Sequence, residues 1–138
     1  MALNIEKVEV WSGELGDSVG GLAAVLGPLA EAGADLSFVV ARRQPDKPGT
    51  GVAFVGGIKG AKQAKAAEAA GLMKAPNLAA LLIDATNKPG LLHRTVQQVA
   101  SAGINLRGVS ASVTGTKCII VLAFDSAADR DQAAKSLK

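Results

Sequence analysis

The sequence predicts an α+β fold made of two copies of one β-α-β-β-α-β unit, each an antiparallel sheet with both helices on one face. Two observations predict this fold. Residues 8–44 recur without a gap at residues 78–114, an offset of 70. In addition, apolar runs, helical spacings and glycine-containing turns follow the same order in both copies. The copies fill the 138 residues, which leaves no room for a separate catalytic domain and favours a binding module over an enzyme.

The repeat is carried by small and apolar residues. After the second strand of each copy the offset falls to 66, because Gly49-Thr50 recurs as Gly115-Thr116, and this predicts four extra loop residues in the first copy (70 − 66 = 4). We expect two units, residues 1–75 and residues 76–138. The matched positions are Gly20, Leu22, Ala30, Ala32, Gly33, Leu36, Val39 and Ala41 in the first copy, and Gly90, Leu92, Ala100, Ala102, Gly103, Leu106, Val109 and Ala111 in the second.

The first copy begins with an apolar run of strand length, followed by apolar residues at helical spacing. Two further strands flank a loop rich in glycine and proline, and an alanine-rich helix follows them. The expected elements are strand 7–15, helix 19–32, strands 36–43 and 51–58, helix 59–70 and a short strand 73–76.

The second copy repeats this order. Its first strand ends at a polar turn containing proline and glycine, and Leu92, Val96 and Val99 then recur at helical spacing. A tight turn around Gly115 joins the next two strands. The expected elements are strand 78–85, a helix through these apolar residues, strands 106–113 and 117–124, and a last helix capped by Asp125 or Ser126 that runs to Leu137.

The second copy lacks a clear last strand, because the sequence stops directly after its last helix. Its sheet therefore has an edge to cover, either with another segment of the chain or with a second molecule. Two of its strands are also apolar on both faces, which is typical of strands that are covered on both sides. We expect an oligomer, specifically a homodimer.

Composition excludes several classes of protein. The longest apolar run, Leu78–Ile83, is far too short to span a membrane. The N-terminus turns acidic where a signal peptide is apolar, so we expect a cytoplasmic protein. The single Cys118 excludes an intrachain disulfide and a cysteine cage for a metal, and the single His93 excludes a multi-histidine site. We expect no metal and no cofactor.

Charge and aromatic content bear on the partner. Residues 73–138 hold eight Lys and Arg against four Asp and Glu, whereas residues 1–72 hold seven against eight. This imbalance favours an anionic small ligand but is too weak to indicate nucleic acid. Phe54 and Phe124 are too sparse for the stacking platform that RNA binding needs.

The strand-to-helix turns suit an amino acid. A tight turn leaves the first N–H groups of the helix unpaired, and these groups favour a carboxylate. Asn105 offers a side-chain donor and acceptor, while Asn87 or Asp17 offers an oxygen to an ammonium group. The N–H groups concerned are those of Gly90, Leu91 and Leu92 in the second copy, and of Gly20, Gly21 and Leu22 in the first.

The stretch Leu82-Ile83-Asp84-Ala85-Thr86-Asn87-Lys88-Pro89-Gly90-Leu91-Leu92, followed by Ala102-Gly103-Ile104-Asn105-Leu106, resembles the ACT domain. The family pattern is a strand, then Asp-x-Pro-Gly-x-Leu opening a helix, then Gly-Ile-Asn before the next strand. ACT domains are regulatory amino-acid-binding modules with a ferredoxin-like fold, attached to enzymes such as aspartate kinase. The resemblance implies a tandem ACT protein whose ligand residues are Asp84, Asn87, Lys88, Pro89, Gly90, Leu91, Leu92 and Asn105, with Asp17, Gly20, Gly21 and Leu22 in the first copy.

Each copy departs from the family pattern at a different place. Asn87 stands where the family prefers Asp, while in the first copy Val19 replaces the Pro and Asp35 replaces the Asn. We expect the second copy to be the better site, because Asp35 would repel a bound carboxylate at close range.

Simpler interpretations of the same residues stay open. Asn87 and Asp17 are also typical helix N-caps, Asp84 also suits a strand end in solvent, and Asn105 also suits a turn.

The function expected from the resemblance is a stand-alone amino-acid-sensing module that regulates a partner enzyme in trans. The alternative is a degenerate tandem module that serves dimerisation or partner docking without a ligand. An acylphosphatase-like enzyme needs an Arg in the turn before the helix, and Arg94 lies within the helix.

Overall fold

The computed structural model describes residues 3–138, which form two compact units. Residues 9–75 form the N-terminal unit, and residues 3–8 together with 76–138 form the C-terminal unit. Each unit has the strand order and the paired helices of a ferredoxin-like fold, so the predicted α+β fold class is confirmed. Within residues 3–138, no helix combines the length and the apolar character needed to cross a membrane.

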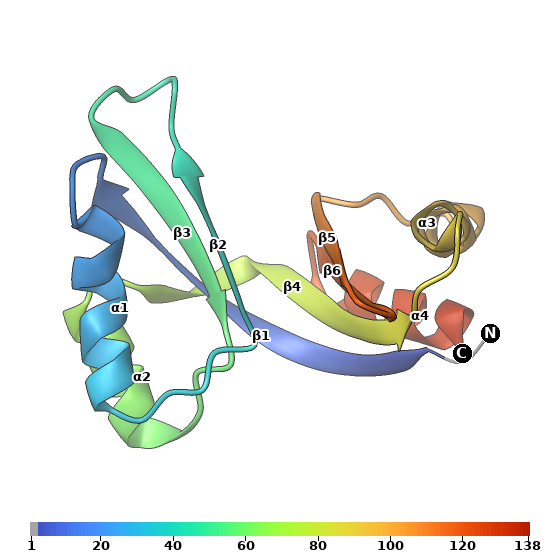
Figure 1. Cartoon of the computed structure of the whole chain (residues 1–138), viewed down its shortest axis with the longest axis horizontal. Helices are drawn as coiled ribbons and strands as arrows, with labels where there is room; N and C mark the ends of the chain where they lie inside the picture. The colour runs from blue at the N-terminus through green and yellow to red at the C-terminus, as the bar shows by residue number, and fades with distance from the viewer. Residues whose placement is uncertain (1–2) are drawn as a thin grey trace. The chain divides into compact units, whose positions relative to one another are not determined.

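In the N-terminal unit the strands follow the order β2-β3-β1-β4. Helices α1 and α2 lie on one face of these strands, as Figure 1 shows. The core between the helices and the sheet contains Trp11, Val25, Leu29, Val55, Ala67 and Leu72. The elements are β1 (Asn4–Gly16), α1 (Gly21–Glu31), β2 (Phe38–Arg43), β3 (Thr50–Gly56), α2 (Gly60–Ala69) and the first residues of β4 (Met73–Thr86).

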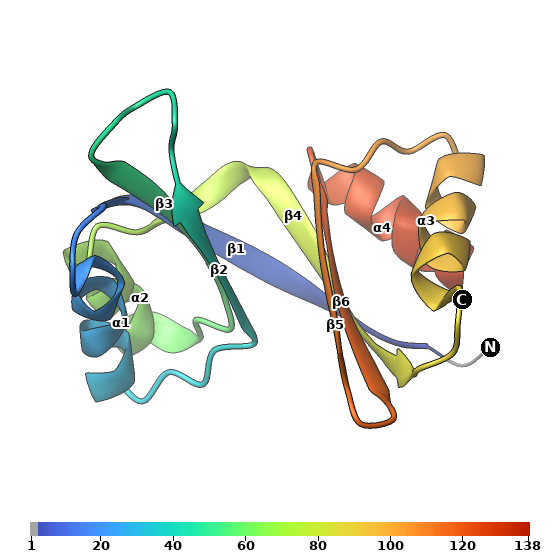
Figure 2. The ribbon, with the colours of Figure 1, turned by 45° about the horizontal axis from the view of Figure 1, so that its top comes forward.

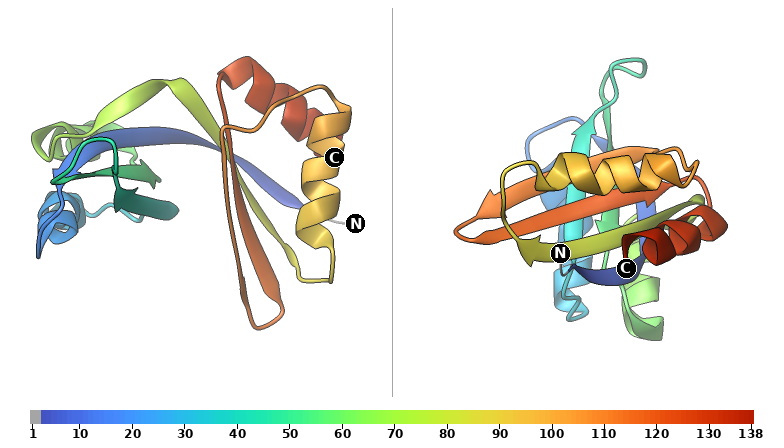
Figure 3. Two further views of the ribbon diagram at one scale, coloured as in Figure 1. Left: turned by 90° about the horizontal axis from the view of Figure 1, so that it is seen from above. Right: turned by 90° about the vertical axis from the view of Figure 1, so that its right-hand side faces the viewer.

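In the C-terminal unit the order is β1-β4-β6-β5. Helices α3 and α4 again share one face of the strands (Figure 2; Figure 3, right). Alternate residues of β4 and β6 face these helices and form a core with Leu91 and Val99. The additional elements are α3 (Leu91–Ser101), β5 (Gly108–Thr114), β6 (Lys117–Phe124) and α4 (Ala127–Leu137), whose N-cap Ser126 accepts a hydrogen bond from the Asp129 N–H at 3.1 Å.

Strands β1 and β4 each contribute residues to both units. Residues 4–8 of β1 belong to the C-terminal unit, where Ile5 packs against the core and Lys7 forms a 3.1 Å ion pair with Asp131 of α4. The strand that the second copy lacks is therefore supplied by another segment of the chain. Residues 73–75 play the corresponding part in the N-terminal unit, where Lys74 pairs with Glu9 at 3.0 Å.

Two details of the strands differ from the sequence-based expectation. The strands expected at 73–76 and 78–85 are one continuous strand, β4. The extra loop of the first copy has three residues rather than four, because Trp11 pairs with Val55 while its counterpart Leu81 pairs with Leu122, an offset of 67 (122 − 55 = 67; 70 − 67 = 3). Hydrogen-bond register defines the equivalent positions, and a match between two short glycine turns misses it by one residue.

Candidate functional site

The turn between β4 and α3 is the centre of the predicted site. The N-cap of α3 is Gly90, whose φ of 82° is a left-handed conformation that favours glycine, and no side chain caps the helix. In the first copy Gly20 is the N-cap with a φ of 80°, again without a side-chain cap. The interpretation of Asn87 and Asp17 as simple helix caps is therefore wrong.

Hydrogen bonds define which N–H groups the turn offers. The Leu91 N–H donates to the Lys88 carbonyl at 3.1 Å, and the Arg94 N–H makes the first bond of the helix, to the Gly90 carbonyl at 3.0 Å. The N–H groups of Leu92 and His93 precede that bond in the helix and have no intrahelical acceptor. The donors available to a ligand are thus one residue further along the helix than expected, and the helix dipole adds positive potential there.

The turn opens onto a hollow of about 390 Å³, a volume within the range of small-molecule sites. Leu91 and Cys118 are buried at its base, whereas Leu92 is 38% and Val113 53% exposed at its rim. The hollow therefore combines apolar walls with the polar start of a helix. Its lining consists of residues 87–93 from the turn and α3, residues 111–113 from β5, and Cys118 from β6.

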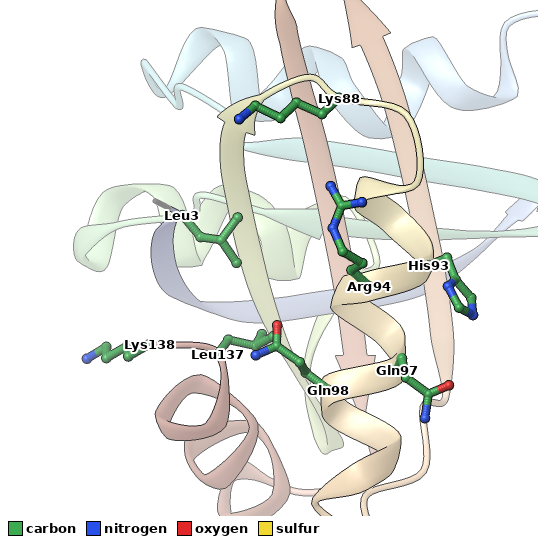
Figure 4. Close-up of a pocket in the computed structure, with 8 residues that line it drawn as sticks. All are labelled: Leu3, Lys88, His93, Arg94, Gln97, Gln98, Leu137 and Lys138. Atoms are coloured by element: carbon green, nitrogen blue, oxygen red, sulfur yellow. The ribbon is translucent and has the colours of Figure 1, made fainter. Parts of the chain in front are cut away.

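A second hollow, of about 750 Å³, lies against α3 and also includes Lys88 and His93 (Figure 4). In Figure 4, Lys88 and Arg94 extend over it, and Leu3 and Leu137 form the opposite wall. The Arg94 Nη1 donates to the Pro89 carbonyl at 3.2 Å, so its guanidinium lies beside the turn. None of the eight lining residues is acidic. Cationic side chains therefore add to the positive potential of the helix start, which favours an anionic group.

Two predicted residues are not brought to the turn. Asp84 lies between Ile83 and Ala85, which face the helices, so its side chain is on the opposite face of β4, 3.4 Å from the Lys117 Nζ. This contact is an ion pair without hydrogen-bond geometry, since the buried Asp84 Oδ1 has no hydrogen-bond partner among the described residues. Asn105 follows the other end of α3, which is 11 residues and about 16 Å long.

The first-copy turn has the same backbone as the second. The Gly21 N–H donates to the Ser18 carbonyl at 3.0 Å, and the Ala24 N–H donates to the Gly20 carbonyl at 3.0 Å. Its side-chain contacts differ from those of the second copy: the Asp17 Oδ2 lies 2.8 Å from the Nε of Arg43 on β2.

Asp35 has no role at this turn. It follows the far end of α1, which also has 11 residues and is about 16 Å long. Its charge is therefore not at close range to a carboxylate held at the turn, and the repulsion expected from the sequence is wrong.

Sequence reasoning missed the part of the lining that comes from the hairpin. Val113 pairs with Cys118, and both side chains lie on the helix-facing side of the sheet, beside the turn between β4 and α3. The signal was present in the sequence: residues that flank the tight turn of a hairpin face each other, so either of them predicts the other as a neighbour. Among residues 3–138 no three His, Cys, Asp or Glu side chains are grouped so that they could hold a metal ion.

Comparisons with known proteins place the fold. No protein-family model matches the sequence, and no curated protein sequence matches it. Among solved structures, the ligand-free regulatory subunit of aspartate kinase from Thermus thermophilus is similar over 99% of this chain and 96% of its own, with a TM-score of 0.64 and 19% identity. A protein of Bacteroides thetaiotaomicron is similar over 98% and 88%, with a TM-score of 0.70 and 17% identity.

A third similar structure is Escherichia coli aspartokinase III in complex with aspartate and ADP. The similarity covers 99% of this chain but 32% of that enzyme, with a TM-score of 0.58 and 15% identity. At such identities the similarity concerns the fold. The chain shares the fold of the regulatory subunits of aspartate kinase, as the resemblance to a tandem ACT protein predicted.

Proposed function

We propose that this protein is a stand-alone amino-acid-binding module of the cytoplasm that regulates an enzyme in trans. The observation that carries the proposal is the turn at residues 87–93, where the start of α3 faces a hollow with apolar walls. The regulatory subunits of aspartate kinase, which share the fold, give the kind of partner: an enzyme of amino-acid metabolism.

Each part of an amino acid has a counterpart at this turn. The carboxylate is held by the N–H groups of Leu92 and His93 and by the positive potential from Lys88. The ammonium group is held by the side-chain oxygen of Asn87, and the side chain lies against Val113 and Leu91. Glycine at position 90 keeps the space over the backbone open.

We further propose that the protein acts as a homodimer. All residues of β5 are exposed, so its outer edge presents unpaired backbone groups that a second copy can pair with. Val109 and Val113, which are 47% and 53% exposed, add apolar area along the same strand. Light scattering tests the dimeric state, and a stable monomer at high micromolar concentration contradicts it.

The first experiment is a thermal-shift screen with the twenty amino acids. For 138 residues the unfolding entropy is about 0.29 kcal/mol/K. An amino acid at about 100 times its Kd adds about 2.7 kcal/mol to the free energy of unfolding, so the Tm rises by about 9 °C. Calorimetric titration of each stabilising amino acid then gives its affinity.

Matched glycine variants assign the binding to one turn. Gly90→Val forces a branched side chain into a left-handed conformation, 3.1 Å from the Arg94 Nη1, and abolishes binding. Gly20→Val carries the same backbone strain at the other turn, where a Cβ meets no atom within 4 Å, and leaves binding intact. Asn87→Ala tests the ammonium contact without backbone strain.

The outcomes separate the candidate functions. Binding that survives Gly90→Val but is lost in Gly20→Val assigns the site to the first copy. Absence of binding by every amino acid at millimolar concentration rejects the proposal and leaves the alternative, a dimerisation or docking module without a ligand.

A further inference from the structure

The two strand-to-helix turns share one backbone but not one set of side chains. Both have a glycine N-cap with a φ near 80°, and both make the same two turn bonds at 3.0–3.1 Å. A difference in ligand binding between the two copies must therefore come from side chains.

Several equivalent positions differ at the turns, and two of these differences concern the contact proposed for the ammonium group. Position 87 is Asn where position 17 is Asp, and position 113 is Val where position 43 is Arg. Arg43 pairs with Gly51 across its hairpin as Val113 pairs with Cys118, so both side chains leave the edge strand on the helix-facing side. In the second copy this position is an apolar wall of the hollow. In the first copy it carries a cation beside the turn.

The cation is bound to the residue that a ligand needs. The Arg43 Nε lies 2.8 Å from the Asp17 Oδ2, and the Asp17 side chain is only 33% exposed while that of Arg43 is 81% exposed. The Asp17 N–H also donates to the Gly49 carbonyl at 3.1 Å, which anchors the residue beneath the loop of the hairpin. Asp17 thus has its carboxylate occupied by a cation of its own chain.

We propose that Arg43 is an intramolecular competitor at the first-copy turn: its guanidinium occupies the Asp17 carboxylate that would otherwise receive an ammonium group, so the first-copy turn binds amino acids more weakly than the second-copy turn. The inference rests on the proposed amino-acid binding at the second-copy turn. It replaces repulsion by Asp35 as the reason why the two copies differ. Arg43 is in this sense a specificity-determining residue that favours binding at the second-copy turn.

The test is site-resolved NMR of the uniformly ¹⁵N-labelled full chain, with each of the twenty amino acids titrated up to millimolar concentration. In the wild type, the amide signals of residues 18–23 shift only at higher amino-acid concentrations than those of residues 88–93. In Arg43→Val, which installs the second-copy residue, the signals of residues 18–23 shift at lower amino-acid concentrations than in the wild type. An exposed ion pair corresponds to at most about a fivefold change in affinity, so binding at the first turn tightens by up to about fivefold.

The matched control is Arg42→Val, because Arg42 pairs with Val52 and leaves β2 on the opposite face. Arg42→Val removes the same charge from the same strand, and it leaves the response of the amide signals of residues 18–23 to amino acids as in the wild type. The reciprocal double variant Asn87→Asp with Val113→Arg builds the pair in the second copy and weakens binding there by up to about fivefold.

The signals of the two turns are read separately, which distinguishes this inference from the proposed function. Wild-type binding at residues 18–23 as tight as at residues 88–93, or no tighter binding there in Arg43→Val, overturns the inference. Absence of wild-type shifts at residues 88–93 rejects the proposed site instead. If Arg42→Val and Arg43→Val change binding at the first turn equally, the net charge of the strand and not the Arg43–Asp17 contact is the cause, and the inference is overturned.

Discussion

The substitution Gly13→Ala tests how closely β1 packs against the segment after α2. A Cβ on Gly13 points directly at the Gly71 carbonyl oxygen and lies 3.0 Å from the Leu72 Cδ2. Leu72 is 2% exposed and belongs to the core of the N-terminal unit. The second copy has Ile83 at the equivalent position, so the first copy gives the space of a large side chain to the segment 71–72.

The expected magnitude follows from the kind of atom in the way. Because that atom belongs to the backbone, the clash is relieved only if β1 and the segment move apart. Overpacking of a filled core costs about 1–3 kcal/mol. With an unfolding entropy of about 0.29 kcal/mol/K, the Tm falls by about 3–10 °C.

The assay is thermal unfolding followed by circular dichroism and by the fluorescence of Trp11, the single tryptophan, which lies in the same core as Leu72. Gly108→Ala is the control, because a Cβ there meets only the Ala123 Cβ, at an ordinary 3.8 Å. The control stays within about 2 °C of the wild type, as substitutions without a steric conflict do. A Gly13→Ala protein that also melts within about 2 °C of the wild type refutes the close packing.

Two further predictions concern residues 3–8. Ile5→Ala lowers the free energy of unfolding, measured in urea, by about 1–2 kcal/mol, because Ile5 packs half-buried on the core of the C-terminal unit. The control Glu6→Ala, at an exposed position, changes this free energy by less than about 0.5 kcal/mol. Equal effects of the two substitutions contradict the packing of Ile5. The pKa of the Asp131 carboxyl is lowered from its ordinary 3.8, first by the hydrogen bond from Lys7 and next by the one from Arg130. A carboxyl whose pKa is lower in the folded than in the unfolded protein stabilises the fold at pH values above its unfolded pKa. This stabilisation is lost as the pH falls through the folded pKa. Lys7→Gln is therefore less stable than the wild type near about pH 7, and the gap narrows below about pH 4; a gap that is constant down to about pH 3 contradicts this.

The sequence was sufficient for the fold because its signals are local and occur twice. Strand-length apolar runs, helical spacings and glycine turns each act over a few residues, and the repeat at an offset of 70 excludes accidental matches. The position of Gly90 at the start of α3 follows from the same local rules. The repeat does not show the hydrogen-bond register of the strands. The predicted number of extra residues in the loop between β2 and β3 therefore differs from the observed number by one.

The candidate site was less predictable because it depends on contacts across the sheet. Asn105 is close to the turn in sequence order, yet a straight helix separates the two. The ion pair between Arg43 and Asp17 joins residues from two strands, and no local pattern predicts it. Family motifs record which residues matter in sequence order, and they leave open whether those residues meet within one chain.

The sharing of β1 and β4 between the units has a consequence for how the chain folds and for whether its two copies can be separated. Ile5 packs on a core that also contains Leu137, which lies 132 residues later in the chain (137 − 5 = 132). The packing of residues 4–8 on this core therefore has a high contact order, and it is complete only after the residues in between have been synthesised. Each half of a chain cut before residue 73 also carries a strand that the other half needs. Co-expressed halves 1–72 and 73–138 should therefore find each other, while either half alone should expose an open sheet edge, so the duplicated copies can no longer be separated by deleting one of them.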